Sequence, residues 1–346
     1  MKKTCFILAI VLLLNIAYAS EKMRTWTSMK GTKVPATLIK DEGSIVILKT
    51  RDGRTVRIKR SSLSKSDNAY LESRSKTLAN NRSGATSDWP GWLGPDRNGK
   101  SRDTGLIKKW PEDGPTLLWK TTGLGEGFSG VAVANGHVYI TGGVNGKLKI
   151  FSYDMKGKEA WSTNHGPMWS KSYPGSRATV QVSDGKLYLM SGEGTLSCYD
   201  ASKGDEIWTR KMGEFGGRAQ GWGYSESVLI VDDTLYVSPG GKTTMAALDK
   251  KTGRSKWESD SFKGAAEYSS AIYAVHDGVP MIINANESGL YALNPSNGSL
   301  FWSNDFCARN TANCPTPAYK DGLVLCSNGT GKRGKCLKLK ALGKRG

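Results

Sequence analysis

The sequence predicts an all-β protein in which a small barrel like an SH3 domain precedes a β-propeller. Two observations carry this prediction. Near the start of the chain, short runs rich in β-branched residues alternate with turn residues. Further on, tryptophans at positions 119, 161, 208, 257 and 302 stand 42, 47, 49 and 45 residues apart. A period in the forties with several short strands in each repeat is typical of a propeller.

Residues 1–19 have the pattern of a secretory signal peptide. Lys2 and Lys3 form a basic start, Phe6–Leu14 is a mostly apolar run, and Ala17–Ala19 supplies a small-x-small cleavage pattern. A membrane anchor, the alternative, needs roughly 18–20 apolar residues, and this run is shorter. We therefore expect export to the bacterial periplasm, the cell envelope or the extracellular space, with no transmembrane segment after cleavage.

The chain carries a formal net charge of +18. This charge favours an anionic partner, and an envelope polymer is the candidate because an exported chain rarely meets nucleic acid. Residues 332–345 form a basic tail with seven Lys or Arg and no acid. The alternative is that the charge serves solubility alone.

Five cysteines follow the leader segment, and four of them cluster near the C-terminus. An oxidising compartment permits disulfides, so two bridges of open connectivity are expected there. The candidates are Cys307, Cys314, Cys326 and Cys336. Their spacings are not the C-x-x-C pairs of a zinc site, and no metal ligand is assigned. Cys198 is left as the odd cysteine.

Residues 20–73 form the small barrel. The runs TKVPATLIK, SIVILKT and RTVRIKR are predicted strands, and Asp52-Gly53 marks one of the turns between them. The stretch SSLSKSDNAYLES predicts a short helical turn that begins at a serine cap. Residues 74–87 are polar and predict a flexible linker to residues 88–346.

The small barrel resembles the first homology domain of the fungal endocytic adaptor Sla. RTWTS at Arg24–Ser28 and DGRTVRIKRSSLSKSDNAYL at Asp52–Leu71 carry the resemblance. It implies a module that binds short peptides. Trp26 and Tyr70 would then line a peptide groove, or they are simply the core of a module too small to have much else.

Each repeat after residue 88 has the same order of elements. A strand, a tight turn and a second strand come first, as in VQVSDGKLYLM, and a third and a fourth strand follow, as in GTLSCYD and DEIW. Dipeptides such as Asp184-Gly185 favour type I′ hairpins. In the turn before the fourth strand, Asp200 can accept backbone hydrogen bonds and Gly204 can supply a positive φ. The tryptophan that follows would wedge against the neighbouring blade and bury ~150–250 Å².

The recurring pattern Ala-x-Asp-x-x-x-Gly-x-x-x-Trp resembles the docking motif of the pyrroloquinoline quinone (PQQ) family of propellers. Ala247–Trp257 matches it fully, Asn294 replaces the Asp of a later copy, and Cys198 fills one Ala position, which suits a small buried residue. Residues 88–111 resemble the segment before the first blade, and outer-membrane-assembly propellers share this fold. The docking tryptophans would be Trp119, Trp161, Trp208, Trp257 and Trp302. The family usually has seven or eight blades, whereas this sequence predicts four and part of a fifth. Such a chain would be a truncated or frameshifted member, one that dimerises to close, or an open arc of blades.

The resemblance also raises the question of catalysis, because PQQ-dependent dehydrogenases bind a quinone and a calcium ion. The sequence has no Cys-Cys pair and lacks the later blades that contribute ligands. In that reading Glu226 or Glu267 would bind calcium; otherwise both are polar groups at the channel rim, paired with Arg177. The segments before the innermost strands would place six side chains at the channel: Arg177, Trp222, Tyr224, Glu226, Glu267 and Tyr268.

The sequence therefore predicts a non-catalytic adaptor of the cell envelope that binds a peptide or protein and needs no cofactor. No residue is assigned a catalytic role. The alternative is an oxidoreductase that depends on PQQ and calcium, of the quinoprotein alcohol dehydrogenase type.

Overall fold

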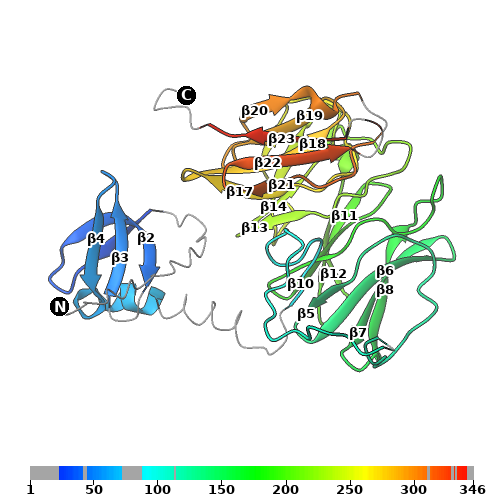
Figure 1. Ribbon diagram of the computed structural model, residues 1–346, viewed down its shortest axis with the longest axis horizontal. Coiled ribbons are helices and arrows are strands. Elements are labelled where there is room, and N and C mark those ends of the chain that lie inside the picture. Colours follow the sequence, from blue (N-terminus) through cyan, green and yellow to red (C-terminus); the bar gives the residue numbers. More distant parts are fainter. Residues whose placement is uncertain are drawn as a thin grey trace, which may run out of the picture. The chain divides into compact units, whose positions relative to one another are not determined.

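The computed structural model describes residues 23–41, 45–71, 88–112, 114–309, 312–328, 331 and 333–340. The chain divides into two compact units, Met1–Ala85 and Thr86–Gly346. The predicted signal peptide and linker lie outside the described residues. Among the residues described, no helix is both long and apolar enough to cross a membrane. The all-β class predicted from the sequence is confirmed (Figure 1).

The first unit is an antiparallel sheet of four strands in chain order. The strands are β1 (Arg24–Thr27), β2 (Lys33–Asp41), β3 (Ile45–Thr50) and β4 (Thr55–Lys59), followed by the 3-10 turn η1 (Arg60–Ser62). A short helix occupies residues 65–71, and the Asp67 N–H donates to the Ser64 hydroxyl at 3.2 Å, as the predicted serine cap requires. One face of the sheet packs on this helix, because Val46, Leu48 and Leu71 share one buried cluster.

Trp26 lies at the centre of this cluster. It is 1% exposed, and its indole N–H donates to the Ala36 carbonyl at 3.1 Å. Tyr70 packs edge-on against it, with ring centroids 5.9 Å apart, and the Arg24 guanidinium covers the Tyr70 ring at 3.8 Å. The same guanidinium pairs with the buried Asp67 carboxylate at 2.6 Å. Trp26 therefore belongs to the core rather than to an open groove, and Tyr70 is partly covered.

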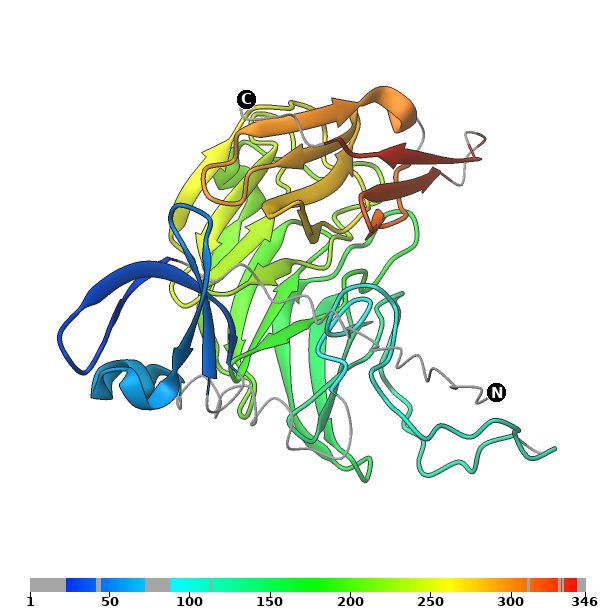
Figure 2. The same ribbon diagram turned by 60° about the vertical axis from the view of Figure 1, so that its left-hand side comes forward.

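The second unit is a β-propeller built from consecutive antiparallel sheets (Figure 2). The described residues form four complete blades, of which the first has the strands β5 (Ala132–Ala134), β6 (His137–Val144), β7 (Lys147–Asp154) and β8 (Glu159–Pro167). The second has β9 (Gln181–Ser183), β10 (Lys186–Met190), β11 (Thr195–Asp200) and β12 (Glu206–Lys211), and the third has β13 (Leu229–Val231), β14 (Thr234–Val237), β15 (Met245–Asp249) and β16 (Ser255–Ser259). The fourth has β17 (Ile272–His276), β18 (Val279–Asn286), β19 (Gly289–Leu293) and β20 (Leu300–Asn304). The fifth sheet has the strands β21 (Ala318–Lys320), β22 (Leu323–Asn328) and β23 (Arg333–Lys338). The 3-10 turns η2 (Met212–Phe215) and η3 (Asp305–Cys307) follow β12 and β20.

The first strands of the complete blades contact one another in chain order, from β5 through β9 and β13 to β17. The tight turns after β5, β9 and β17 have the geometry that their Asn-Gly and Asp-Gly sequences predict. At the turn after β9, for example, Asp184 and Gly185 have φ of 48° and 70°. Two successive positive φ values are the mark of a type I′ hairpin. Part of the predicted basic tail, Arg333–Lys338, is not a tail but the strand β23.

Four of the five repeat tryptophans are seated on the next sheet through an indole hydrogen bond. Trp208 of β12 lies over the turn between β15 and β16, and its indole N–H donates to the Lys250 carbonyl at 3.0 Å. Within that turn Asp249 accepts the Thr252 N–H at 3.0 Å, and Gly253 has a φ of 70°. A Cβ on Gly253 would lie 2.7 Å from the indole ring, so the turn needs glycine both for its φ and for the contact.

The same seating recurs at three other junctions. The indole N–H of Trp119 donates to Met155, that of Trp161 to Ala201 and that of Trp257 to Pro295, at 3.1, 3.2 and 3.0 Å. In each case the acceptor directly follows the Asp or Asn of the motif. Cys198, in the Ala position of its repeat, is fully buried opposite Trp208.

Trp302 departs from this pattern. Its indole nitrogen is buried and has no hydrogen-bond partner among the described residues. In the fifth sheet Lys338 pairs with Leu323 after the Asp321-Gly322 turn, which is the register that Asp200 has in the second blade. A lysine thus takes the place of the turn-closing carboxylate. Among the described residues, the junction between the fourth blade and the fifth sheet has no counterpart of the indole hydrogen bond found at the earlier junctions.

The segment before the first blade fastens several sheets together. Trp89 exchanges backbone hydrogen bonds with Val133 of β5, and the Val182 N–H of β9 donates to the Pro90 carbonyl. Further along, the Arg97 guanidinium donates to the Ser227 and Val228 carbonyls at 2.8 and 2.9 Å. A separate bond joins the Trp92 indole to the Thr316 hydroxyl at 3.0 Å. This segment therefore contacts the first three blades and the loop before β21.

No disulfide bond joins any of the five described cysteines. Cys198, Cys307 and Cys326 are buried, whereas Cys314 and Cys336 are exposed. Burial raises the pKa of the Cys198 thiol to about 11, which keeps it protonated and inert at neutral pH.

The seating of Trp208 predicts a specific effect of Gly253→Ala. The matched control is Gly185→Ala, because Gly185 has the same φ of 70° but has no neighbour within 4 Å of an added Cβ. Both variants adopt an unfavourable φ, which costs about 1–2 kcal/mol. Gly253→Ala must also displace the indole, which adds roughly 1–3 kcal/mol. We expect urea unfolding to show the larger loss of stability for Gly253→Ala, and equal losses would show that the contact with Trp208 contributes nothing.

Candidate functional site

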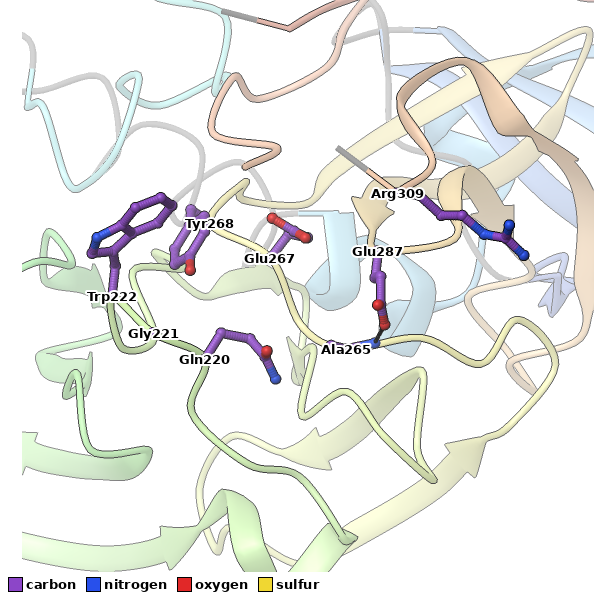
Figure 3. A pocket seen from close by; sticks show the side chains of 8 residues that line it. All are labelled: Gln220, Gly221, Trp222, Ala265, Glu267, Tyr268, Glu287 and Arg309. Carbon is purple, nitrogen blue, oxygen red and sulfur yellow. Dashed lines mark hydrogen bonds between the residues drawn. The ribbon is translucent and has the colours of Figure 1, made fainter. Parts of the chain in front are cut away.

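A hollow of about 450 Å³ opens between the loops of the third and fourth blades. Four loops line it: the one between η2 and β13, the one before β17, the one after β18 and the one after η3 (Figure 3). The lining residues are Gln220, Gly221, Trp222, Ala265, Glu267, Tyr268, Glu287 and Arg309. The hollow therefore combines two aromatic rings with two carboxylates, one guanidinium and one amide.

The aromatic wall is formed by Trp222 and Tyr268. Their ring centroids are 5.6 Å apart with an interplanar angle of 53°, and both side chains are half-buried. The Tyr268 backbone N–H donates to the Asn313 carbonyl at 3.2 Å, which fixes this side of the hollow. The partly exposed ring faces could pack against an apolar or cationic group.

The carboxylates of Glu267 and Glu287 follow the aromatic rings along the hollow, between Tyr268 and Arg309 in the view of Figure 3. Glu267 accepts the Asn313 backbone N–H at 2.9 Å, and Glu287 accepts the Ala265 backbone N–H at 3.1 Å. Burial raises the pKa of Glu267, its hydrogen bond with Asn313 opposes the rise, and the charge of Glu287 adds to it. A cation placed between the two carboxylates would relieve this cost.

Three of the six side chains that the sequence assigned to the channel line this hollow: Trp222, Glu267 and Tyr268. Arg177 does not line it. The Arg177 guanidinium donates to the Ser172 and Tyr173 carbonyls at 2.7 and 2.6 Å, so backbone carbonyls accept the donors that the sequence assigned to a channel carboxylate.

Tyr224 and Glu226 were expected to face or flank the channel, and both are buried instead. Tyr224 is 3% exposed, and its hydroxyl donates to the Pro239 carbonyl at 2.7 Å. Glu226 is 2% exposed and accepts the backbone N–H and the hydroxyl of Ser238 at 2.8 and 3.1 Å. Both residues lie close in sequence to Trp222, which lines the hollow, but their side chains point into the core instead of lining it.

Glu226 begins a buried polar network between the third and fourth blades. The Ser238 hydroxyl accepts the Asn284 side-chain N–H at 3.0 Å, and Asn284 accepts the Ser269 hydroxyl at 2.7 Å. Burial raises the pKa of Glu226 to about 7, against the opposing effects of its bonds with Ser238 and the charge of Arg97. Glu226 is therefore a structural group rather than a ligand open to solvent.

The two carboxylates that the sequence proposed as calcium ligands do not form a calcium site. Calcium takes roughly six to eight oxygen ligands, most of them from carboxylates and carbonyls that can turn toward the ion. Both carboxylates proposed from the sequence, Glu226 and Glu267, are already held by protein donors. Throughout the described ranges no three His, Cys, Asp or Glu side chains are grouped as metal ligands would be.

Sequence reasoning missed Gln220, Glu287 and Arg309. It considered only the segments directly before the innermost strands, whereas Glu287 follows β18 and Arg309 follows η3. A signal was available for Glu287, because it lies in the turn between the second and third strands of its blade. In a propeller that turn lies at the same end of the blade as the segment before the first strand.

A family model described as outer membrane protein assembly factor BamB matches residues 145–336. An uncharacterised protein of Rickettsia prowazekii is 26% identical over 194 residues, which are 56% of this chain and 43% of that protein. The tetrathionate hydrolase of Acidithiobacillus ferrooxidans is 25% identical over 184 residues, which are 50% of this chain and 31% of the hydrolase. The chain thus spans less than half the length of these curated relatives.

Among solved structures, the quinohemoprotein alcohol dehydrogenase of Comamonas testosteroni is similar in fold. The match has a TM-score of 0.51 and 15% identity, and it covers 77% of this chain and 51% of the dehydrogenase. At this identity the similarity shows the propeller fold alone.

The raised pKa of Glu226 predicts a pH dependence of stability. Between about pH 4.5 and 7 the unfolded chain releases this proton while the folded chain keeps it, so the free energy of unfolding falls as the pH rises through that window. The loss is roughly 3 kcal/mol. We expect Glu226→Gln to abolish this contribution, measured by urea unfolding at pH 5 and pH 8. Glu159→Gln, at an exposed position, should keep the dependence of the parent chain; an unchanged dependence in Glu226→Gln would contradict the assignment.

Proposed function

The chain belongs to the family described as outer membrane protein assembly factor BamB, and on that premise we propose that it is an exported scaffold that binds protein partners without catalysing a reaction. The hollow beside Trp222 and Tyr268 is the proposed binding site. The small N-terminal unit, proposed to be an SH3-like module, would add a second point of attachment. The envelope location rests on the predicted signal peptide and on the family.

One observation carries the proposal: the hollow presents its aromatic rings to solvent while its carboxylates are fixed by backbone donors. Glu267 and Glu287 each accept a backbone N–H, so they are oriented before any ligand arrives. Fixed carboxylates beside an aromatic pair suit a basic or aromatic side chain of a peptide. Such a side chain could contact the carboxylates and the aromatic rings without any rearrangement of the hollow. Partner recognition by a few buried aromatic and charged anchors is typical of protein interfaces.

The alternative function is a PQQ- and calcium-dependent oxidoreductase, and the two functions differ in a simple measurement. A ligand that binds only the native state stabilises it, by about 2.7 kcal/mol at a hundred times its Kd. We expect the melting temperature of the chain from Ser20 to stay unchanged when PQQ and calcium are added together. A rise in melting temperature that is lost in Glu267→Gln would support the oxidoreductase and overturn the scaffold.

Partner binding at the hollow can be tested by site-specific photo-crosslinking. A photoreactive residue in place of Gln220, which lines the hollow, should give a discrete protein adduct in cells that export the chain. The same residue in place of Ile207, which is 44% exposed on β12, is the matched control and should give none. Trp222→Ala should remove the Gln220 adduct, because it removes half of the aromatic wall. An adduct that survives Trp222→Ala, or one that forms equally from position 207, would contradict binding at the hollow.

A further inference from the structure

Two thiols are buried together at the junction between the fourth blade and the fifth sheet. Cys307 ends η3 and is fully buried, and Cys326 lies on β22 and is 3% exposed. Both belong to one hydrophobic cluster, into which Trp302 also packs. The junction is thus held by apolar contacts that include both sulfur atoms.

The Cys326 thiol donates to the Ser327 carbonyl at 3.8 Å, and a hydrogen bond joins it to the Cys307 thiol. This bond, together with burial, raises the pKa of the Cys326 thiol above its usual range. Cys314 and Cys336, the other two candidates for disulfide bonds, are exposed. Of the four C-terminal cysteines, the fold therefore brings Cys307 and Cys326 into contact.

This is also the junction where tryptophan docking is incomplete. The indole nitrogen of Trp302 has no acceptor in the described part of the chain, whereas the corresponding nitrogens of Trp208 and Trp257 each donate to a carbonyl of the next sheet. The turn-closing carboxylate is replaced by Lys338. A covalent link at this place would compensate for the missing hydrogen bond.

We propose that Cys307 and Cys326 form a disulfide bond that fastens the fifth sheet to the fourth blade. The oxidant is a second disulfide, either of low molecular weight or on an oxidising protein. One cysteine thiolate attacks it and forms a mixed disulfide, releasing one thiolate. The other cysteine thiolate then attacks the protein sulfur of the mixed disulfide and releases the second thiolate. The pair loses two protons and two electrons, and the oxidant is reduced to two thiols.

Burial determines when this reaction can take place. Both sulfurs are shielded from solvent in the folded chain, and only the thiolate form attacks a disulfide. The bond should therefore form during folding rather than after it. Once formed, it should resist reducing agents until the junction opens. The presence of an oxidant in the compartment rests on the proposed export, but the pairing of the two cysteines does not.

Refolding in vitro tests the pairing independently of location. The chain from Ser20 is unfolded and reduced, and then refolded either with oxidised and reduced glutathione or with dithiothreitol. Trypsin cleaves after Lys and Arg, which places Cys307 in residues 264–309, Cys314 in 310–320, Cys326 in 321–332 and Cys336 in 336–338. We expect mass spectrometry of the glutathione sample to show peptide 264–309 linked to peptide 321–332. The loop closed is about 20 residues long, so the melting temperature should rise by roughly 5–10 °C relative to the reduced sample.

Two double variants serve as comparisons. Cys314→Ser with Cys336→Ser should keep both the linked peptides and the rise in melting temperature, because these residues are exposed. Cys307→Ala with Cys326→Ala should melt at the same temperature under both refolding conditions. The parent chain alone already decides the question if the variants do not fold. Linkage through Cys314 or Cys336, or full alkylation of Cys307 and Cys326 after oxidative refolding, would overturn the proposal.

Discussion

The seating of one tryptophan on the glycine turn of the next sheet is the interaction on which the propeller depends. A sheet of four strands cannot bury both of its faces alone, and its neighbour must cover the second face. At the Trp208 junction, the indole ring supplies the apolar contact, its N–H satisfies the Lys250 carbonyl, and Gly253 leaves room for the ring. Because a blade contacts mainly its neighbours, stability is close to a sum over such junctions.

The parts of the fold that could be predicted from the sequence are those fixed by local chemistry. The φ of Gly204 and the bonds that Asp200 accepts follow from the turn in which they lie. The hollow could be predicted only in part, because Arg309 lies in a loop that contains none of the repeated motifs. Nor did the sequence indicate that Glu226 is buried, since Ser238, which donates to its carboxylate, is twelve residues away, directly after β14. Non-local packing decides both, and a single sequence does not encode it in any periodic pattern.

The third and fourth blades meet through two different layers. One layer is an apolar cluster against which Trp257 packs, and the other is a polar network from Glu226 through Ser238 to Asn284. The polar layer is costly unless every member is satisfied, so it specifies one relative position of the two blades. The hollow opens at this same junction. The loops that line it are therefore held in one relative position by the two blades that carry them. A strongly basic chain thus holds a locally acidic recess whose shape is set by buried hydrogen bonds.

The docking pattern also has a consequence for how such chains change over time. Each docking tryptophan lies on the last strand of one blade and rests on a turn of the next blade. A segment that runs from one tryptophan to just before the next therefore contains both a tryptophan and the turn on which it rests. Duplication or loss of such a segment leaves every remaining junction with matching partners. Unequal recombination between repeats would therefore alter the number of blades in whole steps. Trp302 and Lys338 mark a junction that has drifted from the shared pattern, and a segment exchanged there would not be interchangeable with the others.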